Sequence, residues 1–159
     1  MTRTAARELA IRLCYAAQLS GADTAETVED FFTPEYFQTL AEEDPVFASY
    51  PDEQQMRYIR QLTGLVYDHY YELNQEIEHY AQGWRLDRIS KIAAAILRCA
   101  MCEILYLDDV PAGAAANEAV ELAKRYEEPE TAAFINGILG SFIRDKVPAE
   151  PSVSETAEE

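Results

Sequence analysis

The sequence is poor in metal ligands and in positive charge. Its 159 residues include 2 histidines, 3 cysteines and 13 lysines and arginines, against 29 aspartates and glutamates. Cys99 and Cys102 form a single CxxC pair, whereas a structural zinc site needs four ligands, usually from two such pairs. The pair also falls inside an apolar stretch, not at a helix start, where a redox thiolate is stabilised. We therefore interpret Cys14, Cys99 and Cys102 as core residues in a reducing compartment, and expect no metal and no cofactor.

Long apolar runs are missing as well. The longest, Ile92–Leu97, ends at Arg98 and is far shorter than the ~20 residues that a membrane-spanning helix needs. Charged residues interrupt the N-terminus, which excludes a secretory signal. Glycine-rich phosphate loops and nucleophile elbows are also lacking. We expect a cytoplasmic protein without membrane contact that is not an enzyme.

The net charge of −16 is unevenly distributed along the chain. Residues 21–55 contain ten acidic residues and no lysine or arginine, and the tail 147–159 adds four glutamates. The first 20 residues instead carry Arg3, Arg7 and Arg12 against Glu8. Because a polyanion meets local charge and not the total, the acidic composition does not exclude a nucleic-acid partner.

Apolar residues recur at helical spacing through most of the chain, and no segment alternates as a strand would. The class predicted from this pattern is all-α, with six or seven helices joined by short loops. Asp52 and Gln55 form a capping-box pattern that opens a single long helix to about Gln82. The predicted helices cover residues 2–20, 24–32, 34–42, 52–82, 92–108, 111–126 and 129–146.

The first predicted helix carries a pattern suited to RNA. Arg3 and Arg7 are four residues apart and share a face, and Tyr15 lies about 80° around the helix from Arg7. Single-stranded RNA is bound by arginines on phosphates and by an aromatic ring on which a base stacks. The alternative is that the arginines form a solvated face and Tyr15 belongs to the core. The pattern alone favours this alternative.

A second unusual feature is Asn136 followed by Gly137 inside the last predicted helix. Glycine there costs about 1 kcal/mol relative to alanine. Close helix packing and contact with a ligand explain that cost equally well.

Three groups of motifs keep the order and spacing of a known family. They are Ala6–Ala10 with Tyr15 and Gln18–Ser20; Trp84–Ile89 with Ala95–Arg98 and Glu103–Leu105; and Asp109–Pro111 with Asn117–Lys124 and Phe134–Leu139. Through them the sequence resembles the NusB family of transcription antitermination factors over about residues 3–144. The resemblance implies two packed three-helix bundles, about 1–82 and 84–146. The acidic tail, 147–159, is expected to be disordered because it is rich in proline, serine and glutamate.

The resemblance also implies a function in ribosomal RNA transcription. Members bind boxA-type single-stranded RNA together with a ribosomal small-subunit protein, NusE, and join an antitermination complex on RNA polymerase. By position, the RNA-binding candidates are Arg3, Arg7, Tyr15, Phe134 and Asn136, and the protein-partner candidates are Arg98, Glu103 and Asn117. Some relatives self-associate, so the sequence leaves a homodimer as one of the alternatives for the oligomeric state.

Several positions depart from the family pattern. Thr4 and Ala133 stand where basic residues are common, and Ala93 and Ala94 stand where charged residues face the protein partner. Fewer phosphate contacts weaken RNA binding and its salt dependence. The alternative function is therefore a NusB-fold protein-interaction module with weak or no RNA binding. In some chains the same helical domain precedes an RNA cytosine methyltransferase, but 159 residues leave no room for a cofactor-binding domain.

Overall fold

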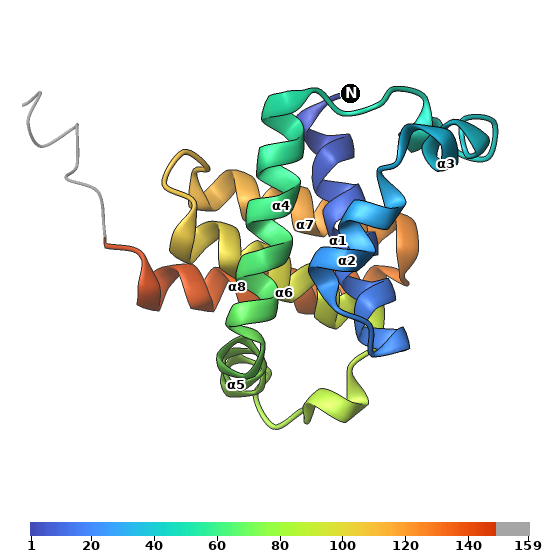
Figure 1. The fold of residues 1–159 in the computed structure, drawn as a ribbon. Coiled ribbons are helices and arrows are strands. Elements are labelled where there is room, and N and C mark those ends of the chain that lie inside the picture. The colour runs from blue at the N-terminus through green and yellow to red at the C-terminus, as the bar shows by residue number, and fades with distance from the viewer. Residues whose placement is uncertain (149–159) are drawn as a thin grey trace, which may run out of the picture.

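The computed structural model describes residues 1–148, and every regular element in that range is helical (Figure 1). The elements are α1 (Arg3–Ser20), α2 (Thr24–Phe31), α3 (Pro34–Thr39), the 3-10 turn η1 (Pro45–Phe47), α4 (Glu53–Asp68), α5 (Tyr70–Tyr80), the 3-10 turn η2 (Leu86–Arg88), α6 (Lys91–Tyr106), α7 (Ala112–Tyr126) and α8 (Pro129–Lys146). The all-α class is confirmed. The predicted disorder of the tail falls mainly on residues 149–159, which lie outside the described residues.

Local sequence signals set several helix ends. The side chain of Thr2 accepts a hydrogen bond from the Ala5 amide at 3.0 Å and caps α1. Gly21 ends that helix in the left-handed region, with φ 71°, where only glycine is unstrained. The capping box that opens α4 is confirmed, because Asp52 and Gln55 each accept a hydrogen bond from the other's backbone amide, at 2.8 and 2.9 Å.

The single long helix predicted over 52–82 is wrong. The chain bends at His69, which ends α4 and precedes α5, so the described residues hold eight helices instead of six or seven. The His69 ring stacks on Tyr106 with centroids 4.4 Å apart, and the bend lets α5 pack Leu73 and Ile77 against α6 and α8. Neither glycine nor proline marks this position in the sequence, so periodicity runs through it without a signal.

Helix α6 lies at the centre of the molecule (Figure 1). It contacts α1, α4, α5, α7 and α8, and every residue from Ala93 to Glu103 is buried. A helix that is apolar around most of its circumference is expected to be covered on all sides. Cys99 and Cys102 are buried here, as predicted; a hydrogen bond to Cys14, with burial, raises the pKa of Cys99 well above its usual value.

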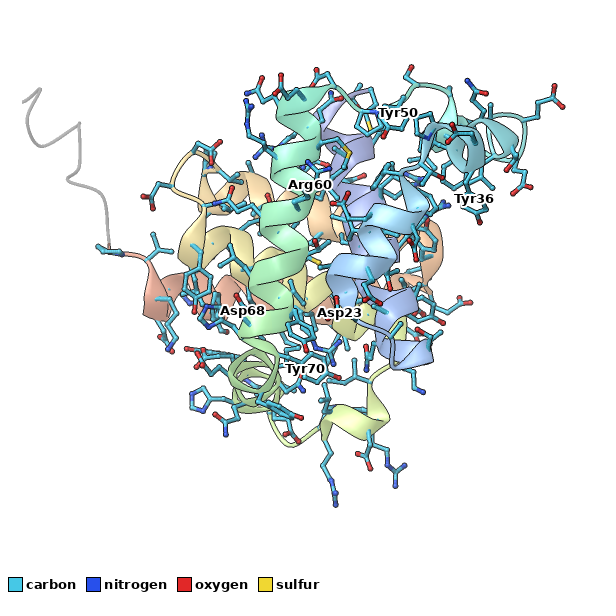
Figure 2. All side chains as sticks on the ribbon, in the orientation of Figure 1. Asp23, Tyr36, Tyr50, Arg60, Asp68 and Tyr70 are labelled. Atoms are coloured by element: carbon cyan, nitrogen blue, oxygen red, sulfur yellow. The ribbon has the colours of Figure 1, made fainter. Side chains whose placement is uncertain are left out.

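The acidic stretch folds around a cluster of aromatic rings. Phe37 lies 5.8 Å from Phe32, 6.0 Å from Phe47 and 5.2 Å from Tyr50, measured between ring centroids. Figure 2 shows Tyr50 and Tyr36 where α3 projects from the other helices. These rings bury apolar area and hold the acidic side chains of this stretch at the surface.

Two further expectations concern domains and membranes. The boundary between two bundles near residues 82–84 stays a prediction. Helix α5, which precedes this boundary in the sequence, packs against α6 and α8, which follow it. Within residues 1–148 no helix is both long and apolar enough to cross a membrane.

Candidate nucleic-acid interface

Arg7, an RNA-binding candidate, lies inside the molecule and pairs with a carboxylate of α6. Its side chain donates from Nε to Oε1 of Glu103 at 2.7 Å and from Nη2 to Oε2 at 2.8 Å. Burial alone would lower the pKa of Arg7, but the hydrogen bonds and charge of Glu103 raise it above its ordinary value. Arg7 is 6% exposed and Glu103 1%. The pair is therefore a closed, charged link between α1 and α6.

Arg3 lies closer to solvent at the start of the same helix. Its guanidinium stacks 3.8 Å from the centroid of the Tyr58 ring, and Nη2 lies 3.7 Å from a carboxylate oxygen of Asp109. Its side chain is 39% exposed, against 8% for Arg7 and 29% for Arg12. Arg3 is thus the arginine of α1 that an external phosphate reaches most easily.

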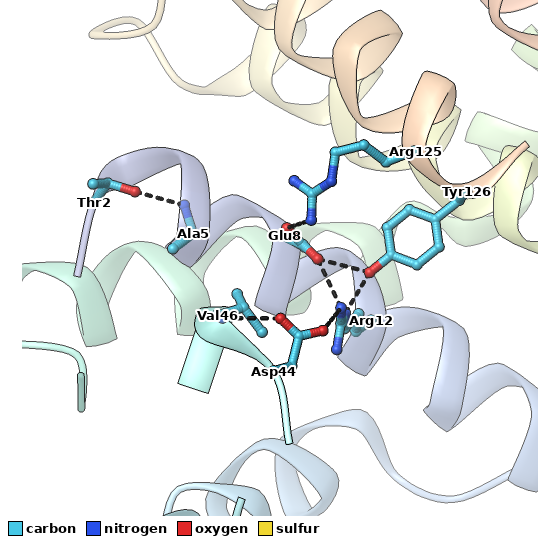
Figure 3. A network of polar contacts seen from close by, with 8 residues as sticks. All are labelled: Thr2, Ala5, Glu8, Arg12, Asp44, Val46, Arg125 and Tyr126. Atoms are coloured by element: carbon cyan, nitrogen blue, oxygen red, sulfur yellow. Dashed lines mark hydrogen bonds and ion pairs between the residues drawn. The ribbon is translucent and has the colours of Figure 1, made fainter. Parts of the chain in front are cut away.

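The third arginine of α1 belongs to a polar network around Glu8 (Figure 3). Buried Glu8 accepts hydrogen bonds from Arg12 at 2.8 Å, Arg125 at 2.8 Å and the Tyr126 hydroxyl at 2.7 Å. Arg12 also donates to Asp44 at 2.9 Å. Burial, then the hydrogen bond to Glu8, raises the pKa of Tyr126 to about 12. Carboxylates from distant segments therefore neutralise the positive charge that the sequence places on α1.

A second candidate surface lies between the end of α5 and α8. The exposed Trp84 ring meets Phe134 edge to face, with centroids 6.2 Å apart. The two rings line a cavity of about 410 Å³ together with Gly137 and Arg144. A Cβ atom added at Gly137 would meet nothing within 4 Å, so close helix packing does not explain this glycine. Asn136 beside it is exposed.

The structure separates the five RNA-binding candidates. Within residues 1–148, no hydrogen bond, ion pair or aromatic contact joins Phe134 or Asn136 to the candidates on α1, where Tyr15 is half-buried. Trp84 lies beside Phe134 but was not among the predicted site residues. Its signal in the sequence is a tryptophan beside Arg85, just after a helix end, where nothing requires a large apolar side chain.

The protein-partner candidates also divide. Arg98 and Glu103 are 2% and 1% exposed, whereas Asn117 is exposed on α7. Ala93 and Ala94, at positions expected to face the partner, are buried. Only Asn117 among the three candidates presents its side chain on the surface.

The family model and similar curated proteins agree on one family. The model described as the NusB family matches residues 4–144. A transcription antitermination protein NusB from Thermoanaerobacter sp. (strain X514) is 37% identical over 146 residues, covering 92% of this chain and 93% of the relative. The protein of the same name from Ruminiclostridium cellulolyticum is 36% identical over 155 residues, covering 98% and 97%.

Solved structures share the fold. The NusB of T. maritima superposes with a TM-score of 0.77 at 22% identity, covering 100% of this chain and 99% of that one. A structure of the antitermination factors NusB and NusE in complex with double-stranded RNA matches with a TM-score of 0.71 at 22% identity, covering 90% and 96%. At this identity the likeness establishes the fold alone.

Proposed function

The chain belongs to the NusB family, and from this membership we propose that it is an RNA-binding transcription antitermination factor. It binds a boxA-type single-stranded RNA together with a NusE-type ribosomal protein, in the cytoplasm, as part of a complex on RNA polymerase. Relatives that match nearly the whole chain are named transcription antitermination proteins, and a NusB of the same fold has been solved with NusE and RNA.

The observation that carries the RNA assignment is the Trp84–Phe134 surface, which consists of Trp84, Phe134, Asn136, Gly137 and Arg144. An exposed ring offers a stacking platform for a base, and a nearby arginine offers a phosphate contact. Because Gly137 leaves open space above α8, a nucleotide approaches the backbone closely there.

On α1, Arg3 contacts a phosphate of the RNA. Tyr15, on the same helix, contacts a neighbouring nucleotide. Arg7 acts through its pair with Glu103, which fixes α1 against α6. Direct contact between Arg7 and a phosphate requires the guanidinium to leave Glu103. Likewise, Arg98 and Glu103 support the partner surface from behind, and Asn117 touches the partner.

The alternative is a NusB-fold interaction module with weak or no RNA binding. It is favoured by one observation, namely that each arginine of α1 lies within 4.0 Å of a carboxylate oxygen. RNA phosphates must then compete with these carboxylates for the arginine side chains.

A titration of boxA-like RNA into the full chain, with and without a NusE-type partner and at two salt concentrations, tests the proposal. We expect salt-sensitive binding that the partner strengthens. Trp84→Ala and Arg3→Glu should weaken it, whereas Arg60→Glu, an equal charge change at an exposed residue paired with Glu29, should not. Partner binding without any contribution from RNA would establish the interaction module instead.

A further inference from the structure

A cavity of about 560 Å³ opens where α1 ends and α2 begins, opposite the junction of α4 and α5. Figure 2 shows Asp68 and Tyr70 at this end of the molecule, near Asp23. Its volume is in the range of small-molecule sites. Its polar and aromatic lining includes Gln18, Tyr67, Asp68, Tyr70, Tyr71 and Arg98.

Arg98 lines this cavity and is 2% exposed, yet it has no carboxylate partner. It donates from Nε to the Asn74 amide oxygen at 2.7 Å and from Nη1 to the Gln18 amide oxygen at 2.9 Å. Its guanidinium lies 4.5 Å from the centroid of the Tyr70 ring. Within residues 1–148 its third nitrogen, Nη2, donates to no acceptor, and no acidic group lies within ion-pair distance.

Within residues 1–148 this arrangement leaves the largely buried Arg98 without a carboxylate, and its unpaired Nη2 remains accessible to solvent. Burial lowers the pKa of Arg98, and the groups that raise it are a tyrosine and two cysteines rather than a carboxylate. Buried charges are ordinarily paired, as Arg7 is with Glu103. An anion in the cavity would supply the missing partner.

The other groups around the cavity mostly favour an anion with a ring. Gln18 lines the cavity and its amide oxygen accepts from Arg98, while its NH₂ group donates to no acceptor within residues 1–148 and is a donor available to a ligand. Tyr67 and Tyr71 are 59% and 81% exposed, which leaves their rings free to stack. One lining carboxylate, Asp68, opposes an anion and forms no ion pair with Arg98.

We propose that this cavity is a binding site for a small organic anion that carries a phosphoryl group on a planar ring, of the nucleoside 5′-monophosphate class. The phosphoryl oxygens accept from Arg98 Nη2 and the Gln18 amide, since a guanidinium edge matches phosphate geometry. The ring stacks on Tyr67 or Tyr71. Arg3 lies about 22 Å from Gln18 along α1, and neither Arg3 nor Trp84 lines the cavity, so separate variants test this site and the proposed RNA function.

Equilibrium dialysis of the full chain against adenosine 5′-monophosphate, adenosine and inorganic phosphate tests the site. We expect the monophosphate to bind at least tenfold more tightly than either of the other two. Arg98→Lys keeps the charge but loses the planar edge, and should weaken monophosphate binding about tenfold. Asp68→Asn removes the opposing charge and should tighten it, whereas Arg3→Glu, which tests the RNA function, should leave it unchanged.

Circular dichroism and the melting temperature establish that each variant folds. If Arg98→Lys does not fold, Asp68→Asn and Tyr71→Ala, at exposed positions, still decide the matter, with tighter and weaker binding expected respectively. Equal affinity for the monophosphate and adenosine, no binding of the monophosphate, or an affinity indifferent to the cavity variants would each overturn the proposal.

Discussion

The two surfaces that sequence motifs associate with RNA differ in how their polar groups are used. On α1, buried or half-buried arginines meet carboxylates from α6, α7 and the segment before η1. On the Trp84–Phe134 surface, the exposed Trp84 ring makes an aromatic contact only with the Phe134 ring among residues 1–148. There, Asn136 is exposed without a side-chain hydrogen bond in that range, and Gly137 has open space above it. The first surface mainly holds the fold together, and the second is available for contact.

We expect the greatest loss of stability from removing the carboxylate that pairs with Arg7 of α1. Glu103→Ala removes both hydrogen bonds of the buried Arg7 guanidinium and leaves it only Glu118, 3.8 Å from Nη1. We expect a loss of about 3–5 kcal/mol in the free energy of unfolding. Urea denaturation followed by circular dichroism measures it. The double variant Arg7→Met, Glu103→Leu removes both charges and should recover most of the loss. If Glu103→Ala were as stable as the parent protein, the Arg7–Glu103 pair would not stabilise the fold.

A second substitution addresses the other surface. Trp84→Ala removes the stacking platform and should weaken RNA binding by about 1–3 kcal/mol, the typical contribution of one stacked base. The melting temperature should change little, because Trp84 is 57% exposed. Fluorescence anisotropy of a labelled boxA-like RNA measures the affinity. A fall in stability without a fall in affinity would reverse the roles assigned to the two surfaces.

A smaller effect is expected from Arg3, the most exposed arginine of α1. Arg3→Gln removes one phosphate contact, so the salt dependence of RNA binding should become shallower by about 0.7 in its logarithmic slope. Affinity measured at several salt concentrations gives the slope. An unchanged slope would remove Arg3 from the RNA contacts, and Arg60→Gln serves as the matched control.

The smallest effect concerns acid stability at Asp44. The hydrogen bond from the Val46 amide, then that from Arg12, lowers the pKa of Asp44 below its ordinary 3.8. Its contribution to stability is therefore present above about pH 4 and is lost as the pH falls through the lower folded-state value. Asp44→Asn should remove that part of the acid dependence of stability. Thermal melts between about pH 2 and pH 5, a range around the ordinary pKa of an aspartate, measure it. An identical pH profile for the variant would count against the Arg12–Asp44 link.

Local patterns predicted much of the fold. Periodicity located the helices, and the signals at Thr2, Gly21 and Asp52 set their ends. The bend at His69 escaped prediction because it depends on packing of α5 against α6 and α8 and has no local breaker.

The candidate site was less predictable, because its decisive contacts join distant residues. Arg7 and Glu103 are 96 positions apart, so the sequence shows an arginine on a helix face without the carboxylate that pairs with it. The Trp84–Phe134 contact likewise joins a loop to a later helix. Family motifs identified both regions, but only the three-dimensional packing distinguishes a closed pair from an available ring.

Trp84 is the only tryptophan in the sequence, so its fluorescence reports directly on the surface that we propose binds RNA. The most direct measurement is the emission of the full chain during titration with boxA-like RNA in the presence of a tryptophan-free NusE-type partner. We expect saturable quenching with the same midpoint as RNA binding by anisotropy, since a base stacks on the exposed ring. Binding by anisotropy with unchanged Trp84 emission would contradict it, because the RNA would then lie on another part of the molecule.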